Sequence, residues 1–149
     1  MPVRYHTSRA QVGLSLPREW EYRSLQELLS EADIVTIHAP LTPATHHLIG
    51  AREFGLMRPT AFLINTARGP IIDEGALVDA LKNGVIAGAG LDVYEQEPTI
   101  HAALTQLKQA VLLPHLGSAT LQARVQMGLV CVKNILAVLE GHPAPNQIP

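Results

Sequence analysis

The sequence predicts an α/β fold built on a doubly wound parallel sheet. Short apolar runs alternate along the chain with segments of helical periodicity, which is the pattern of repeated strand–helix units. The run Asp33–Ala39 is nearly continuous in apolar residues, as expected of a parallel strand that is buried on both faces. Polar motifs follow three of these runs, and open α/β sheets place their ligand sites at the carboxyl ends of strands.

Boundary signals place the individual elements. Ser24 and Glu27 have the spacing of a capping box and begin a short helix. Gly84 ends a later helix, and Gly141 ends the last and longest one. The predicted strands are Pro2–His6, Asp33–Ala39, Thr60–Thr66, Ile86–Val93 and Val111–Pro114, and the predicted helices are Ser24–Glu31, Ala51–Met57, Asp73–Asn83 and Ala119–Glu140.

The glycine pattern of a dinucleotide site is missing from the chain. Such a site normally opens with a strand, the pattern G-x-G-x-x-G and a helix whose N-terminus holds the pyrophosphate. Gly84, Gly88 and Gly90 come nearest to this pattern, but they precede a strand or lie within it. Pro2–His6 has the character of the second strand of such a sheet. We therefore expect an incomplete Rossmann-like domain that lacks the first strand and the G-x-G-x-x-G loop.

The composition limits the classes of partner. With 149 residues, of which 47% are apolar and 16% charged, the chain can form a globular core. The net charge is −2 and the basic residues are scattered, so we expect neither nucleic-acid nor membrane binding. Cys131 is the single cysteine, which excludes an internal disulfide, and we expect a buried, inert thiol. No signal peptide is visible, so the expected location is cytoplasmic.

Three motifs carry the chemistry: Asn65–Gly69, Gly90–Pro98 and Pro114–Ser118. A guanidinium grips a carboxylate through two hydrogen bonds, which lysine cannot do. Histidine titrates near neutral pH and can give or take the proton that interconversion of a ketone and an alcohol requires. A carboxylate on its other ring nitrogen fixes the tautomer and favours the charged form. An arginine, a histidine and a carboxylate therefore suit the reduction of a 2-keto acid.

In this order the motifs closely resemble those of the D-isomer-specific 2-hydroxyacid dehydrogenases, above all the glyoxylate and hydroxypyruvate reductase branch. The resemblance implies that Arg68 binds the substrate carboxylate, that His115 is the acid and base, and that Glu97 orients the imidazole. Glu95 is the alternative partner of the histidine, and the family's Glu-Pro pair favours Glu97. The resemblance covers nearly all of this chain but only the back half of the family. It implies a homodimer acting on a small 2-keto or 2-hydroxy acid.

Cofactor choice depends on the end of the strand Pro2–His6. An acidic residue at this point would bind the ribose 2′-hydroxyl of NAD, but none stands between Met1 and Arg18. Thr7, Ser8 and Arg9 instead offer hydroxyls and a guanidinium to the 2′-phosphate of NADP. We expect NADP, with NAD as the alternative if these residues form an ordinary basic loop. Position at strand ends and the resemblance together imply further cofactor contacts from His38, Pro40, Thr45, Thr66, Ala67, Arg68, Asp92, His115, Gly117 and Ser118.

The adjacent histidines His46 and His47 raise the question of a metal site. Neighbouring side chains point apart, and no cysteine or carboxylate stands at ligand spacing. We expect a solvated turn and no metal.

The long helix Ala119–Glu140 carries two apolar stripes and only a narrow polar band. Burial within its own domain is one explanation. A subunit interface or the missing substrate domain is the other, and the shortness of the chain favours it. We expect residues 1–141 to form a partial NAD(P)-binding domain and residues 142–149 to form a tail toward the substrate domain.

The strand order of a Rossmann sheet, 3-2-1-4-5-6, predicts a gap where the first strand is missing. We expect Pro2–His6 and Asp33–Ala39 on one side of the gap and the later strands on the other. Unpaired strand edges are costly. A compact unit should therefore run from about residue 60 to 140, with residues 1 to about 41 loosely held or re-paired.

The sequence thus predicts a fragment of an oxidoreductase that transfers hydride between NAD(P)H and a 2-keto acid such as glyoxylate or hydroxypyruvate. One alternative is a non-catalytic, dinucleotide-responsive protein of the corepressor type, because the family's fold also serves in that role. The other is an inactive, truncated gene product.

Overall fold

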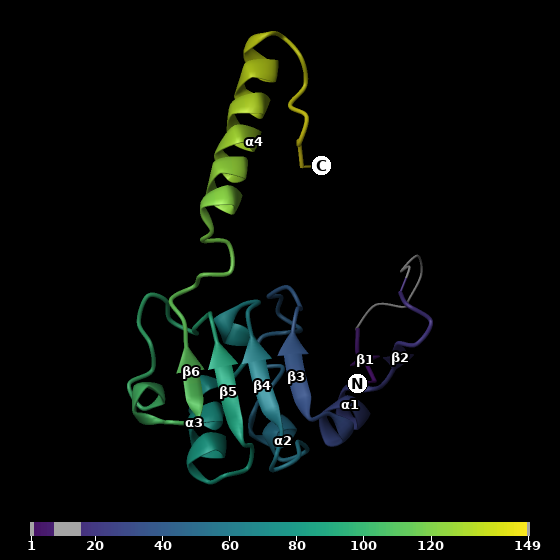
Figure 1. Cartoon of the computed structure of the whole chain (residues 1–149), viewed down its shortest axis with the longest axis vertical. Coiled ribbons are helices and arrows are strands. Elements are labelled where there is room, and N and C mark those ends of the chain that lie inside the picture. The colour runs from purple at the N-terminus through teal and green to yellow at the C-terminus, as the bar shows by residue number, and fades with distance from the viewer. Residues whose placement is uncertain (1, 8–15, 149) are drawn as a thin grey trace. The chain divides into compact units, whose positions relative to one another are not determined.

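The computed structural model describes residues 2–7 and 16–148. The chain divides into two compact units, Met1–Pro114 and His115–Pro149, and each is described by itself. All strands of the described residues belong to the first unit (Figure 1).

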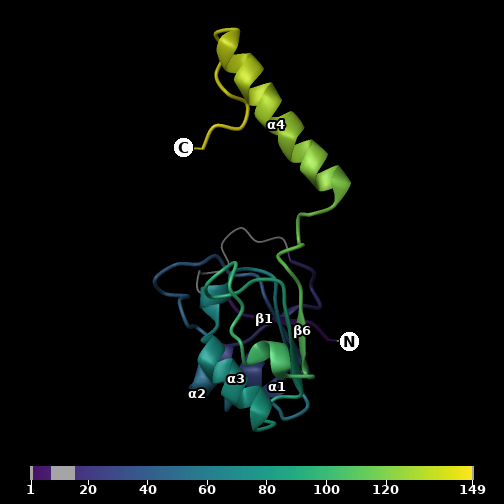
Figure 2. The ribbon, with the colours of Figure 1, turned by 90° about the vertical axis from the view of Figure 1, so that its left-hand side faces the viewer.

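A parallel four-stranded sheet forms the centre of the first unit, in the order β3-β4-β5-β6. Helices α2 (Ala51–Phe54) and α3 (Glu74–Lys82) lie against one side of it (Figure 2). The strands are β3 (Ile34–Ile37), β4 (Phe62–Asn65), β5 (Gly88–Leu91) and β6 (Ala110–Leu112). Each lies within or beside its predicted range, so the predicted α/β class and parallel sheet are confirmed.

Burial alternates along the strands. In β3, Val35 and Ile37 are buried while Ile34 is 53% exposed, and in β4 Leu63 is buried while Phe62 is 48% exposed. The buried side chains pack against the helices, where Phe54, Ile71, Leu77, Leu81, Ile86 and Leu104 complete the core. The prediction that Asp33–Ala39 is buried on both faces is therefore wrong, because helices of the described residues cover the sheet on one face.

A separate two-stranded parallel sheet joins β1 (Arg4–Tyr5) to β2 (Glu21–Tyr22). The sequence analysis missed β2, which is only two residues long and carries one charged side chain. In the order 3-2-1-4-5-6, β2 and β1 take positions three and two, and β3 takes position four. The prediction that Asp33–Ala39 lies on the same side of the gap as Pro2–His6 is therefore wrong.

The N-terminal segment belongs to the first unit, in which helix α1 (Leu25–Glu31) follows β2. Ser24 caps α1 in the predicted capping box with Glu27. Leu29 is fully buried, and the Glu31 carboxylate pairs with the Arg4 guanidinium at 2.9 Å. The predicted compact unit of residues 60–140 is therefore wrong at both ends, because residues 1–41 belong to the first unit and the boundary falls after Pro114.

The second unit contains α4 (Leu121–Leu139) and the segment that follows it. The Thr120 hydroxyl caps the helix by accepting from the Ala123 N–H at 3.2 Å. The side-chain oxygen Oδ1 of Asn134 accepts from the Asn146 backbone N–H at 2.9 Å, which ties the tail to the helix. The apolar stripes are exposed, and so is Cys131, contrary to the prediction of a buried thiol, because no other element of this unit packs over them. Among the described residues, no helix has both the length and the apolar character needed to cross a membrane.

Candidate functional site

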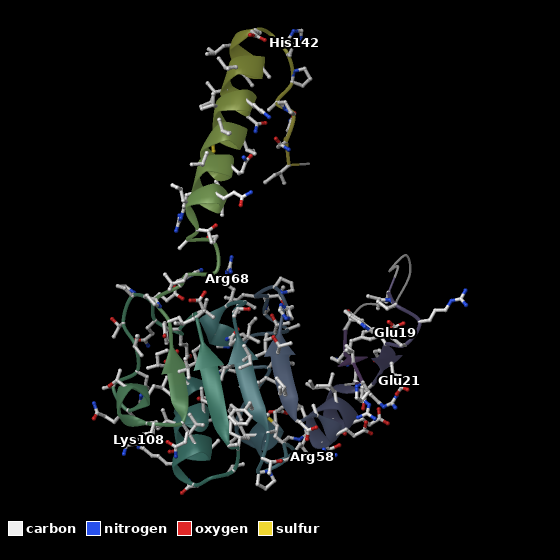
Figure 3. The ribbon with its side chains drawn as sticks, in the orientation of Figure 1. Glu19, Glu21, Arg58, Arg68, Lys108 and His142 are labelled. Carbon is white, nitrogen blue, oxygen red and sulfur yellow. The ribbon has the colours of Figure 1, made fainter. Side chains whose placement is uncertain are left out.

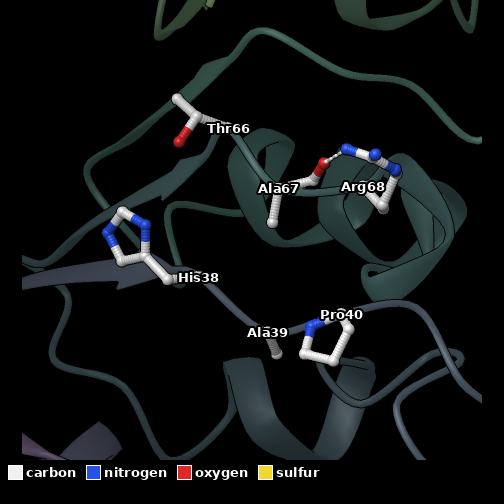
Figure 4. A pocket seen from close by; sticks show the side chains of 6 residues that line it. All are labelled: His38, Ala39, Pro40, Thr66, Ala67 and Arg68. Atoms are coloured by element: carbon white, nitrogen blue, oxygen red, sulfur yellow. Dashed lines mark hydrogen bonds between the residues drawn. The ribbon is translucent and has the colours of Figure 1, made fainter. Parts of the chain in front are cut away.

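The candidate site is a pocket at the carboxyl ends of β3 and β4. It has a volume of about 470 Å³ and is lined by His38, Ala39, Pro40, Thr66, Ala67 and Arg68 (Figure 4). The first three follow β3 directly and the last three follow β4 directly. Five of these six are predicted cofactor contacts. The structure therefore brings them together from segments that lie about thirty residues apart in the sequence.

Asn65, the last residue of β4, holds the loop that carries Arg68. Its side chain is fully buried, its carbonyl oxygen accepts from the Ala67 N–H at 3.0 Å, and its amide group donates to the Arg68 carbonyl at 3.0 Å. The loop backbone is thereby fixed at both ends by one side chain. Asn65 begins the first of the three motifs, but the motif alone gives no signal for this role.

Arg68 is exposed at the carboxyl edge of the sheet (Figure 3). One guanidinium N–H donates to the Ala67 carbonyl at 2.6 Å. A guanidinium has five N–H donors, so others remain for a two-pronged contact with a carboxylate.

Gly69 allows the Arg68 loop to approach the next strand-end loop closely. A Cβ atom at Gly69 would lie 1.9 Å from the carbonyl carbon and oxygen of Tyr94. Only a glycine fits this contact without a backbone shift. The glycine of the Arg-Gly pair is therefore a packing requirement of the site.

The segment after β5 brings Asp92 and Glu97 to the same edge. Asp92 is buried, and its N–H donates to the Asn65 carbonyl at 3.0 Å. The Glu97 carboxylate accepts from the Tyr94 N–H at 3.0 Å. The Tyr94 hydroxyl donates to the Leu113 carbonyl at 2.8 Å, and burial raises the pKa of Tyr94. The end of β6 is thus linked to the loop that carries Glu97.

Glu95 has different partners from Glu97. One carboxylate oxygen lies 2.6 Å from His47 Nε2, and the other accepts from the Glu74 N–H at 3.3 Å. His47 is exposed, as expected for a solvated turn, but its ring also contacts a carboxylate from another loop. Sequence reasoning had no signal for this contact, because 48 positions separate the two residues.

Other predicted site residues lie elsewhere. Thr45 does not line the pocket, and its hydroxyl donates to the Pro40 carbonyl at 2.6 Å, which closes the loop. Thr7 follows β1, while Ser8 and Arg9 fall outside the described residues. His115, Gly117 and Ser118 belong to the second unit. Of the predicted catalytic residues, Arg68 and Glu97 therefore belong to the first unit, and His115 is the first residue of the second unit. Within residues 2–7 and 16–148, no three His, Cys, Asp or Glu side chains are grouped to hold a metal ion.

Comparison with known proteins gives consistent matches. Residues 1–117 match the family model described as D-isomer specific 2-hydroxyacid dehydrogenase, NAD binding domain. A glyoxylate reductase of Aeropyrum pernix is 46% identical over 149 residues, which is 99% of this chain and 44% of the relative. Glyoxylate/hydroxypyruvate reductase B of an Enterobacter species is 44% identical over 147 residues, 98% of this chain and 45% of the relative. The chain thus spans less than half the length of these curated relatives.

Solved structures agree with the sequence matches. The TT0316 protein of Thermus thermophilus superimposes with a TM-score of 0.92 at 45% identity, covering 100% of this chain and 46% of that one. The NADPH-dependent glyoxylate/hydroxypyruvate reductase of Sinorhizobium meliloti, solved with NADP and malonate, gives a TM-score of 0.81 at 38% identity. That match covers 90% of this chain and 41% of the other.

Proposed function

Because the chain belongs to the D-isomer-specific 2-hydroxyacid dehydrogenase family, we propose that it is part of an enzyme that interconverts a small 2-keto acid and its D-2-hydroxy acid. The observation that carries the proposal is the pocket after β3 and β4, in which Arg68 lies beside the predicted cofactor contacts. The names of the relatives point to glyoxylate and hydroxypyruvate as the substrates.

The proposed roles follow from the chemistry of three side chains. Arg68 binds the substrate carboxylate through two parallel hydrogen bonds. His115 protonates the alkoxide that forms from the carbonyl oxygen, and takes the proton back in the oxidation direction. Glu97 orients the imidazole by accepting from its other ring nitrogen. The contacts of Glu95 with His47 and Glu74 support Glu97 for this role, because the Glu95 carboxylate is already engaged elsewhere.

The pocket suits part of a nicotinamide dinucleotide. Its volume of about 470 Å³ falls in the range of ligand pockets, and it combines apolar walls from Ala39, Pro40 and Ala67 with polar groups from His38, Thr66 and Arg68. When bound, NAD(P)H supplies the hydride. We propose NADP as the cofactor, from the absence of an acidic residue between Met1 and Arg18 and from the Thr7-Ser8-Arg9 segment. The remaining proposed contacts are Thr45, Asp92, Gly117 and Ser118.

The proposal extends to the whole enzyme. We propose a cytoplasmic homodimer in which residues 1–141 are part of the NAD(P)-binding domain and residues 142–149 lead toward the substrate domain. The single cysteine, which excludes an internal disulfide, supports a reducing compartment.

The test of this function compares two lengths of chain. A protein completed at its N-terminus with the substrate domain, the first strand and the G-x-G-x-x-G loop should reduce glyoxylate or hydroxypyruvate with NADPH. The 149-residue chain alone should show no steady turnover, because it lacks the backbone N–H groups that hold the pyrophosphate. A misplacement of about 1 Å already costs on the order of 100-fold in rate. A completed protein that binds NADPH but turns over neither acid would contradict the proposal and favour a corepressor-like role.

Arg68→Lys in the completed enzyme should lower kcat/KM for the keto acid about 10- to 100-fold, the effect of losing one hydrogen bond between charged groups. The loss should appear mainly in KM, because the charge stays while the two-pronged geometry is lost. Steady-state kinetics provides the measurement. Arg58→Lys is the matched control, since Arg58 pairs with Asp33 at the opposite edge of the sheet (Figure 3). Equal effects of the two substitutions would contradict the role of Arg68.

A further inference from the structure

A cluster of side chains outside the pocket links two strand-end loops of the first unit to the start of helix α3. The cluster consists of His47 after β3, Glu74 at the start of α3 and Glu95 after β5. His47 Nε2 lies 2.6 Å from Glu95 Oε1, a distance typical of a hydrogen bond with a charged partner. Glu95 and Glu74 exchange hydrogen bonds between backbone and side chain: the Glu95 N–H donates to the Glu74 carboxylate at 2.6 Å, and the Glu74 N–H donates to the Glu95 carboxylate at 3.3 Å.

His47 also contacts the loop that carries Arg68. Its backbone N–H donates to the Pro70 carbonyl at 2.8 Å, and its φ of 50° lies in the left-handed region. A non-glycine residue adopts this conformation only where its surroundings favour it. The backbone of His47 therefore joins the loop after β3 to Pro70, two residues after Arg68. Its side chain joins the same loop to Glu95, two residues before Glu97.

Charged and titratable groups surround the contact of His47 with Glu95. The neighbours of His47 are the Glu95 carboxylate, the His46 ring at 4.1 Å between centroids, and Glu74 through Glu95. Glu74 is buried, and burial raises the pKa of its carboxyl; its contact with the Glu95 N–H lowers that pKa, the Glu95 charge raises it and His101 lowers it. Glu95 thus links the His47 ring to the buried carboxyl of Glu74.

We propose that His47 is a positioning residue, which holds the Glu97 loop in register with the Arg68 loop through its hydrogen bond to Glu95. The benefit to the reaction rests on the proposed function, but the contact itself does not. The side chain is suited to this task because its ring nitrogen Nε2 reaches the Glu95 carboxylate while the backbone of the same residue donates to Pro70. Removal of the ring should therefore loosen Glu95 and the neighbouring Tyr94, whose N–H donates to Glu97.

The test uses the ¹⁵N-labelled 149-residue chain and needs no turnover. His47→Ala removes the ring, and exchange of the Tyr94 and Glu95 amide hydrogens should accelerate roughly 10- to 100-fold, the effect on local opening of losing a hydrogen bond to a charged group. His47→Gln keeps an N–H donor at this position, so exchange of these two amides should stay near the wild-type rate.

His46→Gln is the matched control. His46 stacks on His47 within the same turn, and its substitution should leave the exchange of both amides unchanged. The proposal is overturned if the two amides of His47→Ala exchange at the wild-type rate, if His46→Gln accelerates their exchange equally, or if the Gln and Ala variants of His47 behave alike. A completed enzyme that fails to reduce a keto acid, in a protein whose amides exchange as expected, contradicts the proposed function and leaves the role of His47 standing.

Discussion

Replacing His115 by Ala in the completed enzyme is expected to lower kcat roughly 100- to 10,000-fold, the usual contribution of a general acid. Without the imidazole, the alkoxide must take its proton from water. Binding of the keto acid should change little, because Arg68 remains. The measurement is steady-state turnover with NADPH and saturating keto acid.

The control for this substitution lies in the same unit. His142→Ala removes an exposed histidine beyond the end of α4 and should leave kcat unchanged. If His115→Ala kept the wild-type turnover, His115 would not be the proton donor.

Gly69→Ala is expected to destabilise the first unit by about 1–3 kcal/mol, the usual cost of overpacking. The new methyl group would overlap the Tyr94 carbonyl at 1.9 Å, and backbone atoms on both sides cannot rotate out of the way. The Arg68 loop and the Tyr94 loop must therefore move apart. Urea unfolding monitored by circular dichroism provides the measurement, as a lower midpoint with an unchanged slope.

Gly128→Ala is the counterpart with room for a methyl group. Apart from the adjacent residues and the backbone of α4 itself, no heavy atom of the described residues lies within 4 Å of a Cβ at this position, so the substitution should favour the helix by about 0.5–1 kcal/mol. Gly69→Ala with the same midpoint as the wild-type chain would show that the two loops are not packed as described.

Local signals in the sequence were sufficient for the helix starts and for the pocket. The capping box of Ser24 and Glu27 forms as predicted, and Gly84, with a φ of 65°, follows the end of α3. The pocket residues could be predicted because each follows an apolar run, and the carboxyl ends of neighbouring parallel strands meet at one edge. The catalytic roles of Arg68, Glu97 and His115 stay predictions.

The errors concern relations between distant segments. β2 is too short to give a periodic pattern, and without it Asp33–Ala39 was assigned to the wrong position in the strand order. The contact of His47 with Glu95 joins two loops whose approach depends on the packing of the strands before them. No pattern within either loop contains that information.

The alternating burial of β3 and β4 leaves apolar side chains exposed on one face of the sheet. Ile34, Phe62 and Val111 are exposed and, by the pairing register of the strands, lie on the same face of the sheet, opposite the buried side chains. Beside this surface, β3 is an edge strand, since among the described strands it pairs only with β4. An apolar face next to open backbone donors and acceptors is a template for strands of other molecules. We therefore expect aggregation to compete with folding of the 149-residue chain, and to do so less at lower protein concentration.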